Sequence, residues 1–167
     1  MHQQKRQMSD NYYEKLGQLI LGSRLRKLSE RLMLEMGNIY RSRNIDFEPG
    51  WFHIMFLLSE NEKMSITQIS EMLQVSHPSV IQVVGVLEKK DIVKISVDPL
   101  DKRKRMIELS DYGIRLLELI KPVWNEIDQM MITFLSEGDH SANILKAITE
   151  IENNLDEKPL TERMARS

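Results

Sequence analysis

The sequence predicts a mainly α-helical fold that carries one small β-hairpin. Near both ends of the chain, apolar residues return every three or four positions, which is the period of an amphipathic helix. In the middle, two short helical segments flank a three-residue turn, and two runs of alternating branched residues follow them. This order of elements is typical of a winged helix-turn-helix, and we expect long helices on both sides of it.

The first long helix is predicted from Asn11 to Tyr40, with either Ser9 or Asp10 as its amino-terminal cap. Its regularly spaced apolar positions are Leu16, Ile20, Leu21, Leu25, Leu28, Leu32, Met36 and Ile39. A helix of this length exceeds what one small core covers, so we expect part of its apolar face to meet a second copy of the chain. The alternative is a helix that wraps only its own domain.

A helix-turn-helix is predicted between residues 65 and 89. Ser65 and Gln68 have the spacing of a capping box, which starts a helix by satisfying free backbone amides. The residues of this helix that we expect to face inward are Ile69, Met72 and Leu73. Residues 74–76 leave room only for a sharp turn, and Ser76 can cap the next helix. In that helix the inward face is predicted to hold Val80, Val83, Val84 and Leu87.

The exposed amino-terminal end of the second short helix is the predicted base-reading surface, because such an end can enter the major groove of DNA. Its residues are Ser76, His77, Pro78, Ser79, Ile81 and Gln82. The amide of Gln82 can form two hydrogen bonds with an adenine edge, and Ile81 or the Pro78 ring can touch a thymine methyl. The alternative is that these are ordinary solvated surface residues.

A cationic hairpin follows, with strands predicted at residues 92–97 and 105–109 around the connection DPLDKRK. Arg103 is the residue that we expect in the minor groove, whose negative potential attracts arginine where the groove is narrow. The residues that we expect to hold phosphates are Lys94, Lys102, Lys104 and Arg105. Asp98 or Asp101 can pair with Arg103 and hold the shape of the loop.

A second long helix, capped by Ser110 and Asp111, and a further helix around residues 144–155 are predicted after the hairpin, with a break at 136–140. We expect one domain over residues 1–167, in which 11–46 and 110–157 form dimerisation helices and 50–109 form the winged DNA-binding part. The last residues, EKPLTERMARS, are expected to be frayed.

Composition narrows the function classes. The chain has no cysteine, which excludes disulfides and thiolate metal sites, and its net charge of -2 argues against a uniformly basic surface. Its amino terminus lacks the pattern of a secretory signal and no apolar run is long enough to span a membrane, so we expect a cytoplasmic protein without membrane contact. The four histidines lack metal-ligand spacing, and no catalytic motif stands out. We therefore expect no metal, no cofactor and no enzymatic activity.

An apolar cluster is predicted where the first long helix meets the winged part. It consists of Phe47, Trp51, Phe52 and Met55. Such a cluster is more often core, and the alternative is that it lines a pocket for a small effector.

The residues from Ser65 to Val93, followed by DPLDKRKRMIELSDYG, resemble the helix-turn-helix, the wing and the opening of the next helix in the MarR family of bacterial transcription regulators. The likeness runs from about Asn11 to Leu155, and the wing's Asp-x-Arg pattern stands here as Asp101 and Arg103. The resemblance implies an obligate homodimer held by terminal helices. It also implies a repressor that small anionic or aromatic effectors release.

Two residues depart from the pattern of that family. Asp91 stands where glycine is usual, and because aspartate tolerates a left-handed backbone better than most residues, we expect the turn to form. Ile95 stands where arginine is common, which removes a cation near the predicted DNA face.

The resulting hypothesis is a homodimeric regulator, expected to be a repressor, that binds a pseudo-palindromic operator in double-stranded DNA. Its recognition helices would lie about 34 to 36 Å apart, one helical turn of the duplex. One alternative is a winged-helix module that binds a protein partner without sequence-specific DNA binding. Another is a metal-dependent sensor that holds zinc through histidine.

Overall fold

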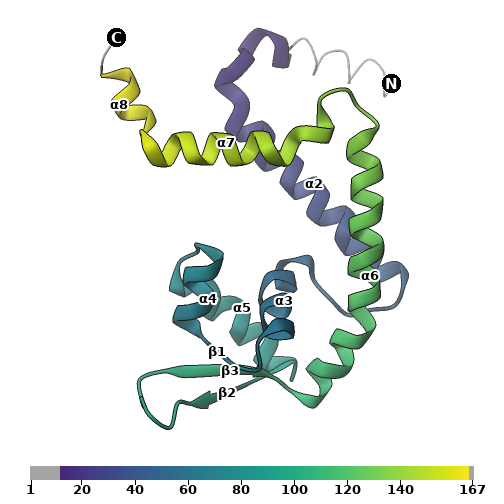
Figure 1. The fold of residues 1–167 in the computed structure, drawn as a ribbon. Helices are drawn as coiled ribbons and strands as arrows, with labels where there is room; N and C mark the ends of the chain where they lie inside the picture. The colour runs from purple at the N-terminus through teal and green to yellow at the C-terminus, as the bar shows by residue number, and fades with distance from the viewer. Residues whose placement is uncertain (1–11, 166–167) are drawn as a thin grey trace. The chain divides into compact units, whose positions relative to one another are not determined.

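The structure, a computed structural model, describes residues 12–165, so the predicted helix start at Asn11 and its caps Ser9 or Asp10 lie outside the described residues. Contacts divide the chain into two compact units, one ending at Leu117 and the other beginning at Glu118. The fold class predicted from the sequence is confirmed, because the chain is mostly helical and carries one small antiparallel sheet (Figure 1). Within residues 12–165, no helix has both the length and the apolar character needed to cross a membrane.

The first long helix is interrupted, which makes the prediction of one helix from Asn11 to Tyr40 wrong. Residues 12–16 are helical, a 3-10 turn η1 (Gly17–Ile20) follows, and the helix α2 (Leu21–Ser42) begins after it. Gly17 has a φ of 51°, in the left-handed region that glycine adopts without the clash a side chain would bring. The change of direction therefore falls at this glycine.

Three short helices surround the core of the first unit: α3 (Phe52–Glu60), α4 (Ile66–Leu73) and α5 (His77–Lys89). A 3-10 turn, η2 (Pro49–Trp51), leads into α3. The residues at the centre of the core are less than 2% exposed and include Met55, Ile69, Val80, Val84, Leu87, Ile92 and Ile107. The predicted inward face of α5 is confirmed by Val80, Val84 and Leu87, with Val83 half-buried.

The predicted burial of Met72 is wrong, since this side chain is 60% exposed. The inward face of α4 is centred on Ile69 and Ser70, which are 0% and 3% exposed. At 100° per residue, Met72 lies well away from that face. Ser70 can occupy a buried position because its hydroxyl donates a hydrogen bond of 2.8 Å to the carbonyl of Thr67.

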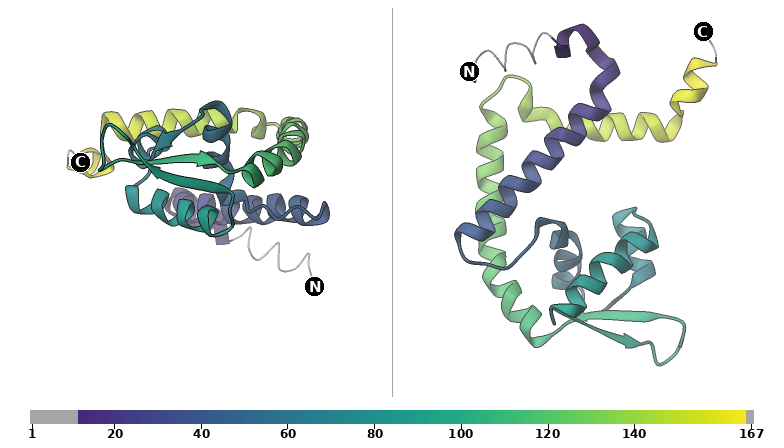
Figure 2. Two further views of the ribbon diagram at one scale, coloured as in Figure 1. Left: turned by 90° about the horizontal axis from the view of Figure 1, so that it is seen from below. Right: turned by 180° about the vertical axis from the view of Figure 1, so that it is seen from behind.

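The sheet has three strands, where the sequence analysis expected two. The hairpin strands β2 (Val93–Val97) and β3 (Arg105–Leu109) are antiparallel, and the two-residue strand β1 (Met64–Ser65) pairs with β3 on its other side. Ile107 is opposite Met64 on one side and Ile95 on the other. The sheet therefore ties the start of α4 to the base of the hairpin, whose loop extends past α4 in both Figure 1 and Figure 2.

The carboxy-terminal elements are α6 (Asp111–Ser136), a 3-10 turn η3 (Ser141–Asn143), α7 (Ile144–Glu157) and α8 (Leu160–Met164). The break between α6 and α7 lies where the sequence predicted it. The end of the chain was expected to be frayed, yet it contains α8. This helix is held by Arg163, whose guanidinium donates to the carbonyls of Lys158 and Asn154 at 2.9 and 2.5 Å.

Candidate nucleic-acid interface

The start of α5 is fixed by a serine cap, as predicted. The hydroxyl of Ser76 accepts a hydrogen bond from the Ser79 amide at 3.4 Å and lies 2.8 Å from the Ser79 hydroxyl. Pro78 sits in the first turn, where its missing amide has no helical partner to lose. Because one serine hydroxyl donates to the other, the pair keeps one hydroxyl proton for an outside acceptor.

The residues predicted to read bases all lie on the surface of α5. Those with exposed side chains are Ser76, His77, Pro78, Ser79, Ile81 and Gln82. Ile81 is the largest apolar one and is 53% exposed, while its neighbour Val80 is 1% exposed. The structure thus brings the predicted set together on one outward surface at the amino-terminal half of the helix.

The turn before α5 has the geometry that a helix-turn-helix requires. The predicted capping box at α4 is present, because the Ser65 amide donates to Gln68 Oε1 at 2.8 Å and the Gln68 amide donates to Ser65 Oγ at 3.2 Å. Gln74 ends α4 in the left-handed conformation, with a φ of 52°. Val75 then donates from its amide to the Ser70 carbonyl at 3.1 Å, which closes the turn.

The loop of the wing is organised by two carboxylates that bind backbone amides. Asp98 Oδ1 accepts from the amides of Leu100 and Asp101 at 2.7 and 3.1 Å, and Asp101 Oδ1 accepts from the Arg103 amide at 3.0 Å. The two amide donors, with Lys104 nearby, lower the pKa of Asp98. From the sequence we expect an aspartate to pair with the Arg103 side chain, whereas Asp98 and Asp101 shape the loop by accepting hydrogen bonds from backbone amides.

The wing has four exposed cations: Lys102, Arg103 and Lys104 in its loop, and Arg105 at the start of β3. Lys94 is the remaining predicted phosphate ligand. Its Nζ lies 3.7 Å from Asp111 Oδ1 and forms an ion pair with that carboxylate. Ile95, at the position where the family often has arginine, is half-buried on β2 opposite Ile107. The cationic surface therefore belongs to the loop more than to the strands.

The junction between α5, β2 and α6 is built around one buried serine. Asp91 has a φ of 56°, so the turn forms in the left-handed conformation as expected. The Ser110 hydroxyl donates to the Asp91 carbonyl and accepts from the Gly113 amide at 2.9 Å, which also confirms Ser110 as a cap of α6. A β-carbon on Gly113 would lie 2.0 Å from the carbonyl oxygen of Ile92. This position has room only for glycine.

Lys90 joins the end of α5 to the loop between α2 and α3, a contact that the sequence analysis missed. Its Nζ lies 2.7 Å from Asp46 Oδ2 and 5.5 Å from the centroid of the Trp51 ring. The hydrogen bond with Asp46 raises the pKa of Lys90. The two partners are 44 residues apart in the chain, so spacing gave no signal for the pair.

The cluster proposed for an effector is packed tightly. Phe47, Trp51 and Met55 are 3%, 7% and 0% exposed, and Phe52 is half-buried. The Phe47 ring lies 5.7 Å from the Trp51 ring and 4.8 Å from the Tyr40 ring. These aromatic contacts place the cluster in the core of the first unit.

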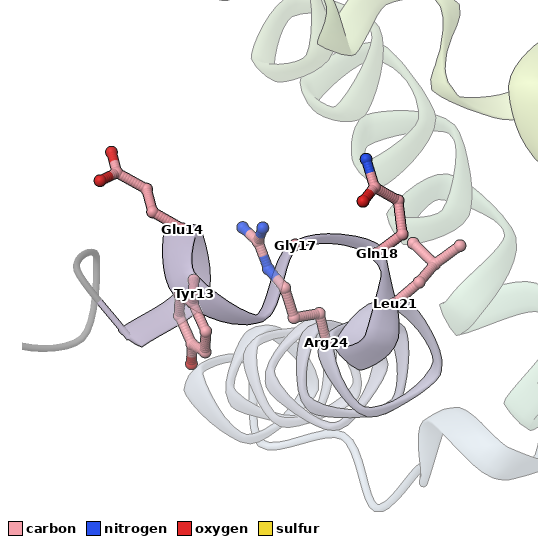
Figure 3. Close-up of a pocket in the computed structure, with 6 residues that line it drawn as sticks. All are labelled: Tyr13, Glu14, Gly17, Gln18, Leu21 and Arg24. Carbon is pink, nitrogen blue, oxygen red and sulfur yellow. The ribbon is translucent and has the colours of Figure 1, made fainter.

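A cavity of about 510 Å³ lies elsewhere in the first unit, at the break before α2 (Figure 3). Its lining residues are Tyr13, Glu14, Gly17, Gln18, Leu21 and Arg24. The Arg24 guanidinium lies 4.8 Å from the centre of the Tyr13 ring, and Lys27 Nζ donates to the Tyr13 hydroxyl at 3.1 Å. Sequence reasoning did not single out this cavity, because it depends on the turn at Gly17.

Among residues 12–165, no three His, Cys, Asp or Glu side chains gather closely enough to hold a metal ion.

Comparison with known proteins shows which proteins this chain is similar to. Residues 45–104, from the loop before α3 to the wing, match the MarR family. The chain is 29% identical over 121 residues to the transcriptional regulator MhqR of Bacillus subtilis, an alignment that covers 66% of this chain and 83% of MhqR. It is 23% identical to a Thauera aromatica regulatory protein for the hcr operon, and it spans only 58% of that protein's length.

Solved structures share the fold. The S. aureus MepR–DNA complex superposes with a TM-score of 0.68 at 21% identity, covering 81% of this chain and 97% of MepR. Bordetella bronchiseptica BpsR, whose DNA binding is regulated by 6-hydroxynicotinic acid, superposes with a TM-score of 0.61 at 18% identity, covering 81% and 91%. Residues 45–104 thus match the MarR family, and the relatives and the shared fold agree with that match.

Proposed function

We propose that this protein is a transcriptional regulator that binds a pseudo-palindromic operator as a homodimer. The observation that carries the proposal is the pairing, within one compact unit, of a capped helix with an exposed polar end and a hydrogen-bonded wing that carries three loop cations and Arg105 at the start of β3. A chain that matches the MarR family over residues 45–104 and has this arrangement contains the parts needed for the major groove and for the adjacent backbone or minor groove.

Each group of residues has a distinct role in this proposal. The residues assigned to base edges are Ser76, His77, Pro78, Ser79, Ile81 and Gln82. Arg103 enters the minor groove, because its backbone is held by Asp101 while its side chain is exposed. Lys102, Lys104 and Arg105 bind phosphates, and Lys94 does so in competition with Asp111.

Dimerisation is supported by apolar side chains that the described chain leaves uncovered on its long helices. In α2 these are Leu21, Leu25, Leu28, Met33 and Leu34, each at least 38% exposed. In α7, Ile151 and Leu155 are each 41% exposed and no residue is buried. Burial of such faces drives association, and a two-fold dimer would present two recognition helices to the two halves of a palindrome.

The test is selection of binding sites from a pool of random duplexes at low and moderate salt. Enrichment of an inverted repeat, with half-sites one helical turn apart and an affinity that falls steeply with salt, supports the regulator. If no sequence is enriched at low salt, the protein does not read DNA by sequence. A winged-helix module that binds a protein partner would then be the better description.

We also propose that the protein acts as a repressor that a small aromatic or anionic molecule releases. The support is the response of BpsR, which has the same fold, to 6-hydroxynicotinic acid. The candidate places are the cluster of Phe47, Trp51, Phe52 and Met55, which must open to admit a ligand, and the cavity beside Arg24. A thermal-shift screen of aromatic acids, repeated with Arg24→Ala, separates these places. Loss of the shift in that variant assigns the cavity, and an unchanged shift assigns the cluster.

A further inference from the structure

The outward face of α5 has an unusual composition for a helix that enters the major groove. From His77 to Leu87 the helix has no Arg, Lys, Asp or Glu. Bidentate contacts from Arg or Lys to guanine are the commonest specific contacts in protein–DNA complexes. This stretch of α5 cannot make them, so its preference among base pairs must come from other groups.

Ile81 lies in the middle of this face and is the most informative residue on it. Its side chain is 53% exposed, although the preceding residue, Val80, is buried. Pro78 is one turn before it, and Gly85 is one turn after it with open space where a β-carbon would be. Residues three and four apart share one side of a helix, so Pro78 and Ile81 form an exposed apolar ridge, and Gly85 adds no side chain that would cover Ile81.

The major groove offers one apolar group to such a ridge, the C5-methyl of thymine. The polar residues beside Ile81 agree with that partner. Gln82 can bond the N6 and N7 atoms of adenine, which pairs with thymine, and the Ser76–Ser79 pair has one free hydroxyl proton. His77 can reach the N7 of either purine and so does not favour guanine.

We infer that Ile81 is a specificity-determining residue that reads thymine C5-methyl groups, so that α5 selects A·T over G·C pairs beneath its outward face. The inference rests on the proposed function and deepens it, since it names the chemical group on DNA that the site recognises. It also explains why a bulky apolar side chain stands exposed on a helix whose other large apolar residues are mostly buried.

The experiment uses the operator obtained by random-site selection and the full-length protein. Each thymine is replaced in turn by deoxyuridine, symmetrically in both half-sites, which removes one methyl per half-site and leaves base pairing unchanged. Burial of a methyl contributes about 0.8 kcal/mol, so a contacted thymine should show about fourfold weaker binding per half-site and about fifteenfold for the pair. Other thymines in the operator should show no change.

The variant Ile81→Ala assigns the effect to this side chain. In that variant the penalty for deoxyuridine at the sensitive positions should disappear, which is the signature of coupling in a double-mutant cycle. Val86→Ala is the matched control, because Val86 is also an exposed apolar residue of α5, at 40%, but lies five residues away on a different side of the helix. The control should keep the full penalty.

Three outcomes overturn the inference. A flat deoxyuridine scan on an operator that still binds would leave the regulator standing and remove the methyl contact. An unchanged penalty in Ile81→Ala would assign the methyl to another residue. Failure to enrich any sequence would remove the proposed function as well, and the apolar ridge would then be assigned to a protein partner.

Discussion

The winged part of the chain and its long helices differ in how completely they cover their own apolar residues. The large buried side chains lie between Tyr40 and Val123, and beyond Val123 none of the described residues is buried. The winged part also satisfies its turns internally, through Ser65, Ser76 and Ser110. The difference indicates that the winged part has a core of its own, although side chains such as Met72 and Ile81 remain exposed, while α2 and α7 carry apolar surface available for association.

The largest expected effect is loss of the dimer when charged residues are placed on the exposed apolar surface of α7. Replacing Ile151 and Leu155 of α7 by glutamate would place unpaired carboxylates in the proposed dimer interface, at several kcal/mol each. The dimer should then dissociate at concentrations at which the unaltered protein remains dimeric, as measured by sedimentation equilibrium. Asn153→Glu adds a carboxylate to an exposed position of the same helix and should leave the dimer intact. A double variant that stays dimeric would show that this surface of α7 is not part of the dimer interface.

The next effect concerns the internal joints of the winged part. Gly113→Ala should destabilise the protein by about 3 kcal/mol, because the added β-carbon meets the Ile92 carbonyl at 2.0 Å. The urea midpoint measures this change. Gly85→Ala is the control, since its β-carbon would enter open space and alanine favours a helix by up to about 1 kcal/mol. Equal midpoints for the two variants would show that the backbone around Gly113 and Ile92 adjusts to the added β-carbon without loss of stability.

A smaller effect is expected from the wing loop. Arg103→Ala should weaken operator binding about tenfold, the loss of about one charge-assisted contact, and should reduce the salt dependence of the affinity. Titration of labelled operator at several salt concentrations measures both quantities. Arg26→Ala on α2 also removes an exposed guanidinium, which pairs with Glu30 at 2.9 Å, and should change neither quantity. An unaltered affinity in Arg103→Ala would remove the wing from the interface.

The smallest effect is local and depends on pH. The amides of Leu100 and Asp101 lower the pKa of Asp98, so the carboxylate stabilises the loop at pH values above the ordinary pKa of aspartate, 3.8. This contribution is lost as the pH falls through the lowered pKa. Hydrogen exchange at these two amides should become faster in Asp98→Ala at neutral pH, with little change in Tm. Unchanged exchange would show that the loop keeps its shape without the carboxylate.

The parts of the fold that could be predicted are those that depend on neighbours in the sequence. The capping box at Ser65 and the cap at Ser76 involve residues three apart, so spacing alone located both helices. The strand β1 was missed because two residues show no alternation. The break at Gly17 was missed because the apolar period continues through the glycine.

The site was predictable in its exposed residues and less so in its supports. The residues predicted to read bases and the wing cations were chosen from helix position and charge, and they are exposed in the structure, while their roles stay predictions. The pair of Lys90 and Asp46 joins residues far apart in the chain, which periodicity cannot reveal. The position of Met72 depended on where the inward face of α4 is centred, and a buried serine shifted that centre.

The buried hydroxyl of Ser110 has a mechanical consequence. It donates to the Asp91 carbonyl in the turn that follows α5, and it accepts from the Gly113 amide in the first turn of α6. Gly113 itself packs directly against the backbone carbonyl of Ile92. These contacts couple the first turn of α6 to the turn that follows α5. A rotation of the beginning of α6 would therefore be passed to α5, the proposed recognition helix, through these contacts.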